Sequence, residues 1–158
     1  MTLALMCCRA GFATVLEDVL PGNLRRAAAR VDAMLPEGLH FATSIEDAVR
    51  HADLVIDTVP DELESKLEIL SLLDRMAPPA ALFATPTASL SIADLASCTY
   101  RPGQCFGLQF SVSVQDSGWC VAIACPPAAS VETRDMLKRF FLALGTEPEL
   151  SQDNSRLP

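Results

Sequence analysis

The stretch from Phe83 to Val114 holds the residues whose types and spacing could support chemistry. Its two informative segments are 85–92, which reads T-P-T-A-S-L-S-I, and 101–114, which begins R-P and ends G-L-Q-F-S-V-S-V. Proton transfer needs a side chain that titrates near neutral pH, and the amide of Gln109 does not. The two histidines, His40 and His51, lie outside the stretch, and we expect both on the surface.

Alternating strand and helix patterns must position this stretch. The strongest strand pattern is 54–59, which is apolar on both faces, as a central parallel strand should be. A long helix follows from 60–62, with an apolar stripe of leucines, and a Pro-Pro pair ends it at 78–79. The stripe comprises Leu63, Leu67, Leu70 and Leu73. The acids near the start of this helix suit its dipole, and Glu62 with Lys66 forms a favourable i,i+4 pair.

The other elements follow the same alternation. Strands are predicted at 14–16, 39–42, 81–85, 105–110, 119–125 and 147–150, with the fourth and fifth of these antiparallel. Helices are predicted after the N-terminus, over 24–34, after Ser44, over 92–97 and after Ser130. Gly11 and Gly145 should end helices, and 36–38 should break the second one. Short links between alternating elements imply a doubly wound α/β sheet.

Composition bounds the function. The 158 residues are 50% hydrophobic, which fits one globular domain with a sizeable core. The net charge of −8 supplies no basic surface for nucleic acid. No apolar run approaches the roughly 20 residues that span a bilayer, and the N-terminus does not resemble a secretory signal. We expect a cytoplasmic protein with no membrane partner.

The six cysteines form no C-x-x-C pair and have no histidine at ligand spacing, so zinc is not expected. Disulfides are not expected either, because the chain is not small and shows no export signal. Cys7, Cys105 and Cys120 sit in apolar runs, where we expect them to be small buried hydrophobic residues.

Asp18 follows the predicted strand 14–16. In dinucleotide-binding α/β domains an acid at this place hydrogen-bonds the adenosine ribose hydroxyls, which selects NAD over NADP. Glu17 competes for that role, one residue earlier. The G-x-G-x-x-G loop that holds the pyrophosphate in such domains does not occur in the sequence.

The two segments within 83–114 resemble the catalytic stretch of the 3-hydroxyacyl-CoA dehydrogenase family, whose members read S-N-T-S-S-L-x-I and then R-P-x-x-x-x-G-x-H-F-F-N-P-V. Segment 52–66 is similar to the family's A-D-L-V-I-E-A-V-P-E-D-L-x-x-K. The resemblance covers nearly the whole chain. It implies a Rossmann-like, doubly wound and mostly parallel sheet with NAD as the cofactor.

The resemblance also implies the cofactor-binding residues. In the family, the acid aligned with Asp61 and the lysine aligned with Lys66 lie beside the cofactor, and Asp18 takes the place of the ribose-binding acid. Two structural alternatives stay open: Asp61 as a favourable charge at a helix N-terminus, and Lys66 as a solvated partner of Glu62. We therefore predict cofactor contacts at Asp18, Asp61 and Lys66.

The family's catalytic side chains are replaced. Its motif serine falls on Ala88, its histidine on Gln109 and its asparagine on Val112, while the glutamate that orients the histidine falls on Val121. We therefore predict no catalytic residue in this chain and no ordinary dehydrogenase turnover.

The resemblance predicts an NAD-binding domain over 1–150 and a tail over 151–158. The first strand and the glycine turn of the family are expected to be lacking. The neighbouring strands would then close up, a second copy or another partner chain would complete the sheet, or the start codon would lie further upstream. The family's helical C-terminal domain is also expected to be lacking, so acyl-CoA binding is not expected.

Three hypotheses follow for the function. The first is a catalytically inactive domain with residual NAD binding. The second is a fragment of an NAD-dependent 3-hydroxyacyl-CoA oxidoreductase of fatty-acid metabolism. The third is a non-enzymatic interaction module or a gene remnant.

Overall fold

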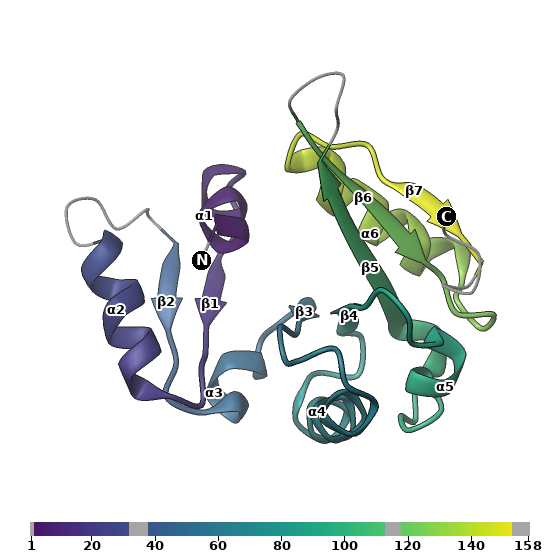
Figure 1. The fold of residues 1–158 in the computed structure, drawn as a ribbon, viewed down its shortest axis with the longest axis horizontal. Helices are drawn as coiled ribbons and strands as arrows, with labels where there is room; N and C mark the ends of the chain where they lie inside the picture. Colours follow the sequence, from purple (N-terminus) through teal and green to yellow (C-terminus); the bar gives the residue numbers. More distant parts are fainter. Residues whose placement is uncertain (1, 32–37, 113–117, 153–158) are drawn as a thin grey trace. The chain divides into compact units, whose positions relative to one another are not determined.

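The computed structural model describes residues 2–31, 38–112 and 118–152. The chain divides into two units, Met1–His51 and Ala52–Pro158, and each is described here by itself (Figure 1). Parts of several predictions lie outside the described residues: Met34 and the helix break at Pro36 and Glu37, Ser113 and Val114 of the second motif, and 153–158 of the tail.

The first unit is a parallel two-stranded sheet with helices. Its elements are α1 (Thr2–Arg9), β1 (Thr14–Leu16), α2 (Pro21–Val31), β2 (Leu39–Phe41) and α3 (Ile45–Val49). In β1 and β2, Thr14 lies beside Leu39. Gly11, with φ of 89°, takes the left-handed conformation after α1, as predicted. Ser44 caps α3 as predicted, because its hydroxyl accepts from the Asp47 amide at 3.2 Å.

The second unit is a five-stranded sheet in the order β3-β4-β5-β6-β7. Its elements are β3 (Leu54–Ile56), α4 (Leu63–Met76), β4 (Leu82–Pro86), α5 (Ile92–Ala96), the 3₁₀ turn η1 (Pro102–Gln104), β5 (Cys105–Val112), β6 (Trp119–Ala124), α6 (Val131–Ala143) and β7 (Glu149–Ser151). Among the described strands of this sheet only the β5–β6 pair is antiparallel, as predicted, and β7 lies at the edge. Among the described residues, each unit thus contains one sheet of its own.

The core of the second unit lies between the sheet and α6 (Figure 1). Alternate residues of the strands face α6, and they pack with Leu137 and Phe141 of that helix. They are Leu82, Ala84, Phe106, Leu108, Val121 and Ile123. Phe83 and Thr85 project to the opposite face and are also buried, on the side where α4 and α5 pack together. Because β4 is covered on both faces, its functional groups can reach a ligand only at the end of the strand.

Two predictions around α4 are wrong in detail. Strand β3 ends at Ile56 rather than at Val59, because the chain turns where the Asp57 side chain bonds to Lys66. The buried stripe of α4 is also rotated from the predicted one. Leu63 is 48% exposed, whereas Leu70 and Leu73 are buried together with Lys66 and Asp74.

Six free cysteines divide by environment. Burial, and secondarily the neighbouring Cys8, raises the pKa of Cys7 to about 11, and burial raises that of Cys105 to about 11. Both thiols are therefore neutral hydrophobic groups, as predicted. The same prediction is wrong for Cys120, which is exposed, because the alternation of β6 points its neighbour Val121 into the core instead.

Arg101 fixes the C-terminal end of α4. Its guanidinium donates to Asp74 Oδ1 at 2.6 Å, to the Asp74 carbonyl at 2.6 Å and to the Pro78 carbonyl, and it lies 5.2 Å from the ring centroid of Phe83. The Arg-Pro motif of the sequence is thus structural, since it satisfies carbonyl groups that a helix end leaves unpaired.

Replacing Arg101 with lysine should lower the free energy of unfolding by about 1–2 kcal/mol, because an ammonium cannot reproduce the forked contacts. Chemical denaturation would measure the loss, with the exposed Arg139→Lys as the control. An unchanged midpoint for Arg101→Lys would contradict this role.

Candidate functional site

A buried ion pair lies at the end of β3. Lys66 Nζ lies 2.9 Å from Asp57 Oδ1 and donates to the Val59 carbonyl at 3.2 Å. The side chains of Lys66 and Asp57 are 0% and 3% exposed, so each charge depends on the other for solvation. The predicted pairing of Lys66 with Glu62 is wrong, since the ammonium lies inside the unit rather than along the surface of α4.

Asp61 joins the loops that follow two neighbouring parallel strands. It is exposed after β3, and its Oδ2 accepts from the Ala88 amide at 2.9 Å, after β4. Desolvation on its own would raise the pKa of Asp61, but the Ala88 amide, the Thr87 hydroxyl and the charge of Lys66 together hold that pKa below its ordinary value. Asp61 is therefore a carboxylate at the carboxyl ends of the strands, where α/β sheets bind their ligands.

The turn after β4 is fixed by Thr87. Its hydroxyl accepts from the Leu90 amide at 3.0 Å, and its own amide donates to the Leu108 carbonyl at 3.1 Å. That second bond extends the β4–β5 pairing past Pro86 and Leu108, and Ala88 and Gln109 each follow one of the two bonded residues. Of these two aligned positions, the structure shows Ala88 in contact with Asp61.

Val121 does not join this group. It is 1% exposed and belongs to the core beneath α6, paired with Phe110 across the β5–β6 ladder. The residue opposite Gln109 is Ala122, which is half-buried. In this register the side chain directly opposite residue 109 is the one at position 122, one residue after the aligned one.

Asp18, in the first unit, bonds to the chain at the start of α2. Its Oδ1 accepts from the Leu20 amide and its Oδ2 from Asn23 Nδ2, both at 2.8 Å. The Leu20 amide, then the Asn23 amide and the charge of Arg26, hold the pKa of Asp18 below its ordinary value. By contrast, burial and the nearby Asp18 charge raise the pKa of Glu17, which leaves Asp18 the better anion of the two.

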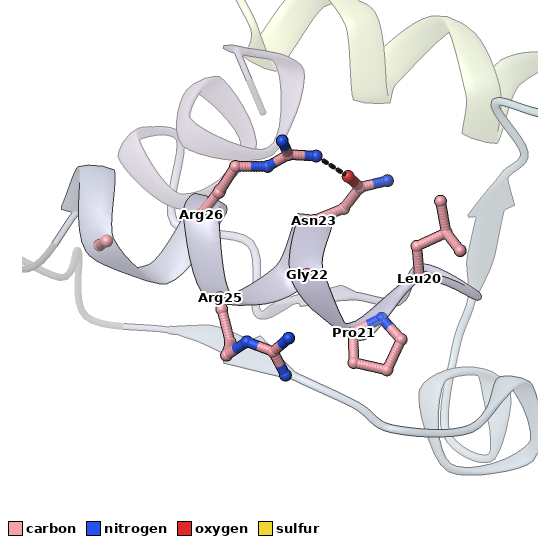
Figure 2. A pocket seen from close by; sticks show the side chains of 7 residues that line it. Leu20, Pro21, Gly22, Asn23, Arg25 and Arg26 are labelled. Atoms are coloured by element: carbon pink, nitrogen blue, oxygen red, sulfur yellow. Dashed lines mark hydrogen bonds between the residues drawn. The ribbon is translucent and has the colours of Figure 1, made fainter.

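An open pocket with a volume of about 570 Å³ lies along the first turns of α2, and Figure 2 shows residues that line it. Arg26 points back toward Asn23 and donates to its side-chain oxygen, whereas Arg25 lies on the other side of the helix (Figure 2). The pocket is lined by Leu20, Pro21, Gly22, Asn23, Arg25, Arg26 and Ala29.

The predicted cofactor residues thus occupy different settings. Asp61 is exposed at the strand ends, Lys66 lies beneath it in the same unit, and Asp18 belongs to the other unit. Their contacts with a cofactor stay predictions.

Asp57 was not identified as a site residue from the sequence, although the family motif has an acid at this position. The spacing of Lys66 to Leu70 and Leu73, four and seven residues, could also have placed it on the buried face.

Other kinds of site find no support in the described residues. They hold no group of three or more potential metal ligands, and no helix among them is long and apolar enough to cross a membrane. Both histidines are exposed, as predicted.

Known proteins resemble this chain in sequence. The chain is 33% identical to human mitochondrial hydroxyacyl-coenzyme A dehydrogenase over 115 residues, which covers 72% of this chain and 36% of that protein. It is 29% identical to 3-hydroxybutyryl-CoA dehydrogenase of Bradyrhizobium diazoefficiens, with 91% of this chain and 54% of that protein covered. The chain thus spans no more than about half the length of these relatives.

Solved structures agree with the fold. The crystal structure of 3-hydroxybutyryl-CoA dehydrogenase from Escherichia coli K12 superposes with a TM-score of 0.80 at 26% identity, covering 94% of this chain and 34% of that one. The family model of the 3-hydroxyacyl-CoA dehydrogenase NAD binding domain matches residues 1–148. This chain therefore belongs to the 3-hydroxyacyl-CoA dehydrogenase family, as a domain of its NAD-binding type.

Proposed function

We propose that this chain binds NAD weakly at the carboxyl ends of β3 and β4 and does not oxidise 3-hydroxyacyl-CoA on its own. One observation carries the proposal: the Asp61 carboxylate accepts from the Ala88 amide at 2.9 Å, in a loop that the 3.1 Å bond from Thr87 to the Leu108 carbonyl aligns with the strand leading to Gln109. Asp61 supplies a carboxylate that could bind a ligand there, while Ala88 and Gln109 offer a methyl group and a neutral amide.

Asp61 has the chemistry to hold a nucleotide. A carboxylate has about four lone-pair positions. The Ala88 amide and the Thr87 hydroxyl use two of them, so a hydroxyl of a bound ribose could use another. Lys66 does not fit a direct contact in this conformation, because its side chain is 0% exposed. When bound, NAD would supply the hydride acceptor of the family's reaction.

Alcohol oxidation also needs a base for the hydroxyl proton. Gln109 cannot accept that proton near neutral pH, and Ala88 has no hydroxyl group with which to orient a substrate. Opposite Gln109, Ala122 offers no group to orient a base. These three side chains support the absence of turnover.

A second candidate is favoured by the share of the relatives that the chain covers. In that case the domain would act as part of a longer NAD-dependent 3-hydroxyacyl-CoA oxidoreductase. Such an enzyme would need its proton acceptor from another part of the protein, since position 109 does not supply one.

We expect no oxidation of NADH when the chain is mixed with acetoacetyl-CoA, followed by absorbance at a protein concentration close to that of the nucleotide. The variant Ala88→Ser/Gln109→His/Val121→Glu should also be inactive, because the new carboxylate would point into the core rather than toward residue 109. Saturable turnover by the unmodified chain, lost in Gln109→Ala, would overturn the proposal and establish Gln109 as part of a working site.

A further inference from the structure

The Asp57–Lys66 pair closes the segment that leads from β3 into α4. Asp57 Oδ1 accepts both from Lys66 Nζ at 2.9 Å and from the Val59 amide at 3.3 Å, while the ammonium also holds the Val59 carbonyl at 3.2 Å. Lys66 therefore binds the turn at two points from the first turns of α4. The conformation of residues 57–60 is fixed by this side chain.

Stability alone does not account for the pair. Both side chains are almost fully buried, and Asp57 Oδ2 has no hydrogen-bond partner within the described part of the chain. Desolvating two charges usually offsets their attraction, so a buried ion pair seldom stabilises a fold more than an apolar pair of the same size. The pair fixes the conformation of the turn at residues 57–60, which an apolar pair could not hold by hydrogen bonds.

The fixed turn at residues 57–60 directs the Asp61 carboxylate toward the Ala88 amide. Only Pro60 separates the fixed turn from Asp61, whose Oδ2 lies 2.9 Å from the Ala88 amide. A one-residue link of restricted φ transmits the position of Val59 to Asp61 with little freedom. The contact between the loops after β3 and β4 therefore depends on Lys66 beneath them.

We propose that Lys66 and Asp57 are positioning residues, which hold Asp61 against Ala88 and do not touch the nucleotide themselves. The part that concerns the nucleotide rests on the proposed function. The Lys66 ammonium contacts Asp57 and the Val59 carbonyl, and it affects the nucleotide site through the position of the Asp61 carboxylate.

The test compares three variants: Asp57→Asn/Lys66→Met, which leaves no buried charge, Asp61→Ala, and the combination of all three changes. Amide hydrogen exchange of Ala88 measures the contact without any nucleotide. We expect exchange to be at least about tenfold faster in the double variant, as for the loss of a hydrogen bond to a charged group. Amides of Leu108 and Ile123 should keep their rates, and Arg101→Lys, at the other end of α4, should leave Ala88 unchanged.

The triple variant decides how Lys66 acts. If it acts through Asp61, the double change adds nothing once Asp61→Ala is present, both for Ala88 exchange and for the dissociation constant of NAD. A further loss of NAD affinity in the triple variant would show direct contact and overturn the proposal, as would unchanged Ala88 exchange in the double variant. If the unmodified chain binds no NAD, the proposed function fails, while Ala88 exchange still tests the positioning role.

Discussion

Replacing Val121 with glutamate should lower the free energy of unfolding by more than about 4 kcal/mol, which places it among the most damaging single changes. Val121 is 1% exposed and packs among the hydrophobic strand residues beneath α6. The glutamate would have to be buried protonated or force the sheet away from α6. Denaturant unfolding followed by the fluorescence of Trp119 would measure the loss.

Ala122→Glu is the matched control for this change. Ala122 is the next residue of the same strand, but it is half-buried and lies opposite Gln109 on the other face. We expect Ala122→Glu to stay within about 1.5 kcal/mol of the unmodified chain. Equal losses at 121 and 122, or a larger loss at 122, would contradict the register of β5 and β6 and return position 121 to the site.

The second large effect is expected at Lys66. Lys66→Met removes the cation but leaves Asp57 buried, and breaking a buried pair in this way costs about 3–5 kcal/mol. Asp57→Asn/Lys66→Met should recover most of that loss, because neither partner is then charged. Thermal and denaturant unfolding of both single variants and the double variant give the coupling energy.

Additive losses in the free energy of unfolding would contradict an interaction between Asp57 and Lys66. If Asp57→Asn and Lys66→Met simply summed in the double variant, the two side chains would not interact in solution. Glu62→Gln is the useful comparison, because Glu62 is exposed and was the partner expected from helix spacing. We expect that change to have an effect within about 0.5 kcal/mol.

Most of the fold could be predicted from local patterns. The caps at Ser44 and Ser130 and the glycine that follows α6 depend on residues adjacent in sequence, and each is found where it was expected. The antiparallel β5–β6 pair followed from the short link between two strand patterns. Such features need no knowledge of the tertiary contacts.

The site was less predictable, because it depends on which face of its helix or strand each residue occupies. Helix spacing allowed Lys66 to meet Glu62, but its position on the buried face of α4 brought it to Asp57 instead. Val121 could be aligned with a catalytic glutamate, yet its side-chain direction depends on the strand register. Asp61 was predicted as a cofactor contact, and the sequence contained no indication of its bond to Ala88.

Titration of the chain with NAD, followed by the amide signal of Ala88, tests the central claim most directly. The account predicts a saturable shift of that signal with a half-maximum below about 1 mM, a concentration range typical of enzyme–substrate affinities. It also predicts weaker binding in Asp61→Ala, which removes the carboxylate beside Ala88. No saturable shift up to that concentration, or the same affinity in Asp61→Ala, would contradict a nucleotide site at the ends of β3 and β4.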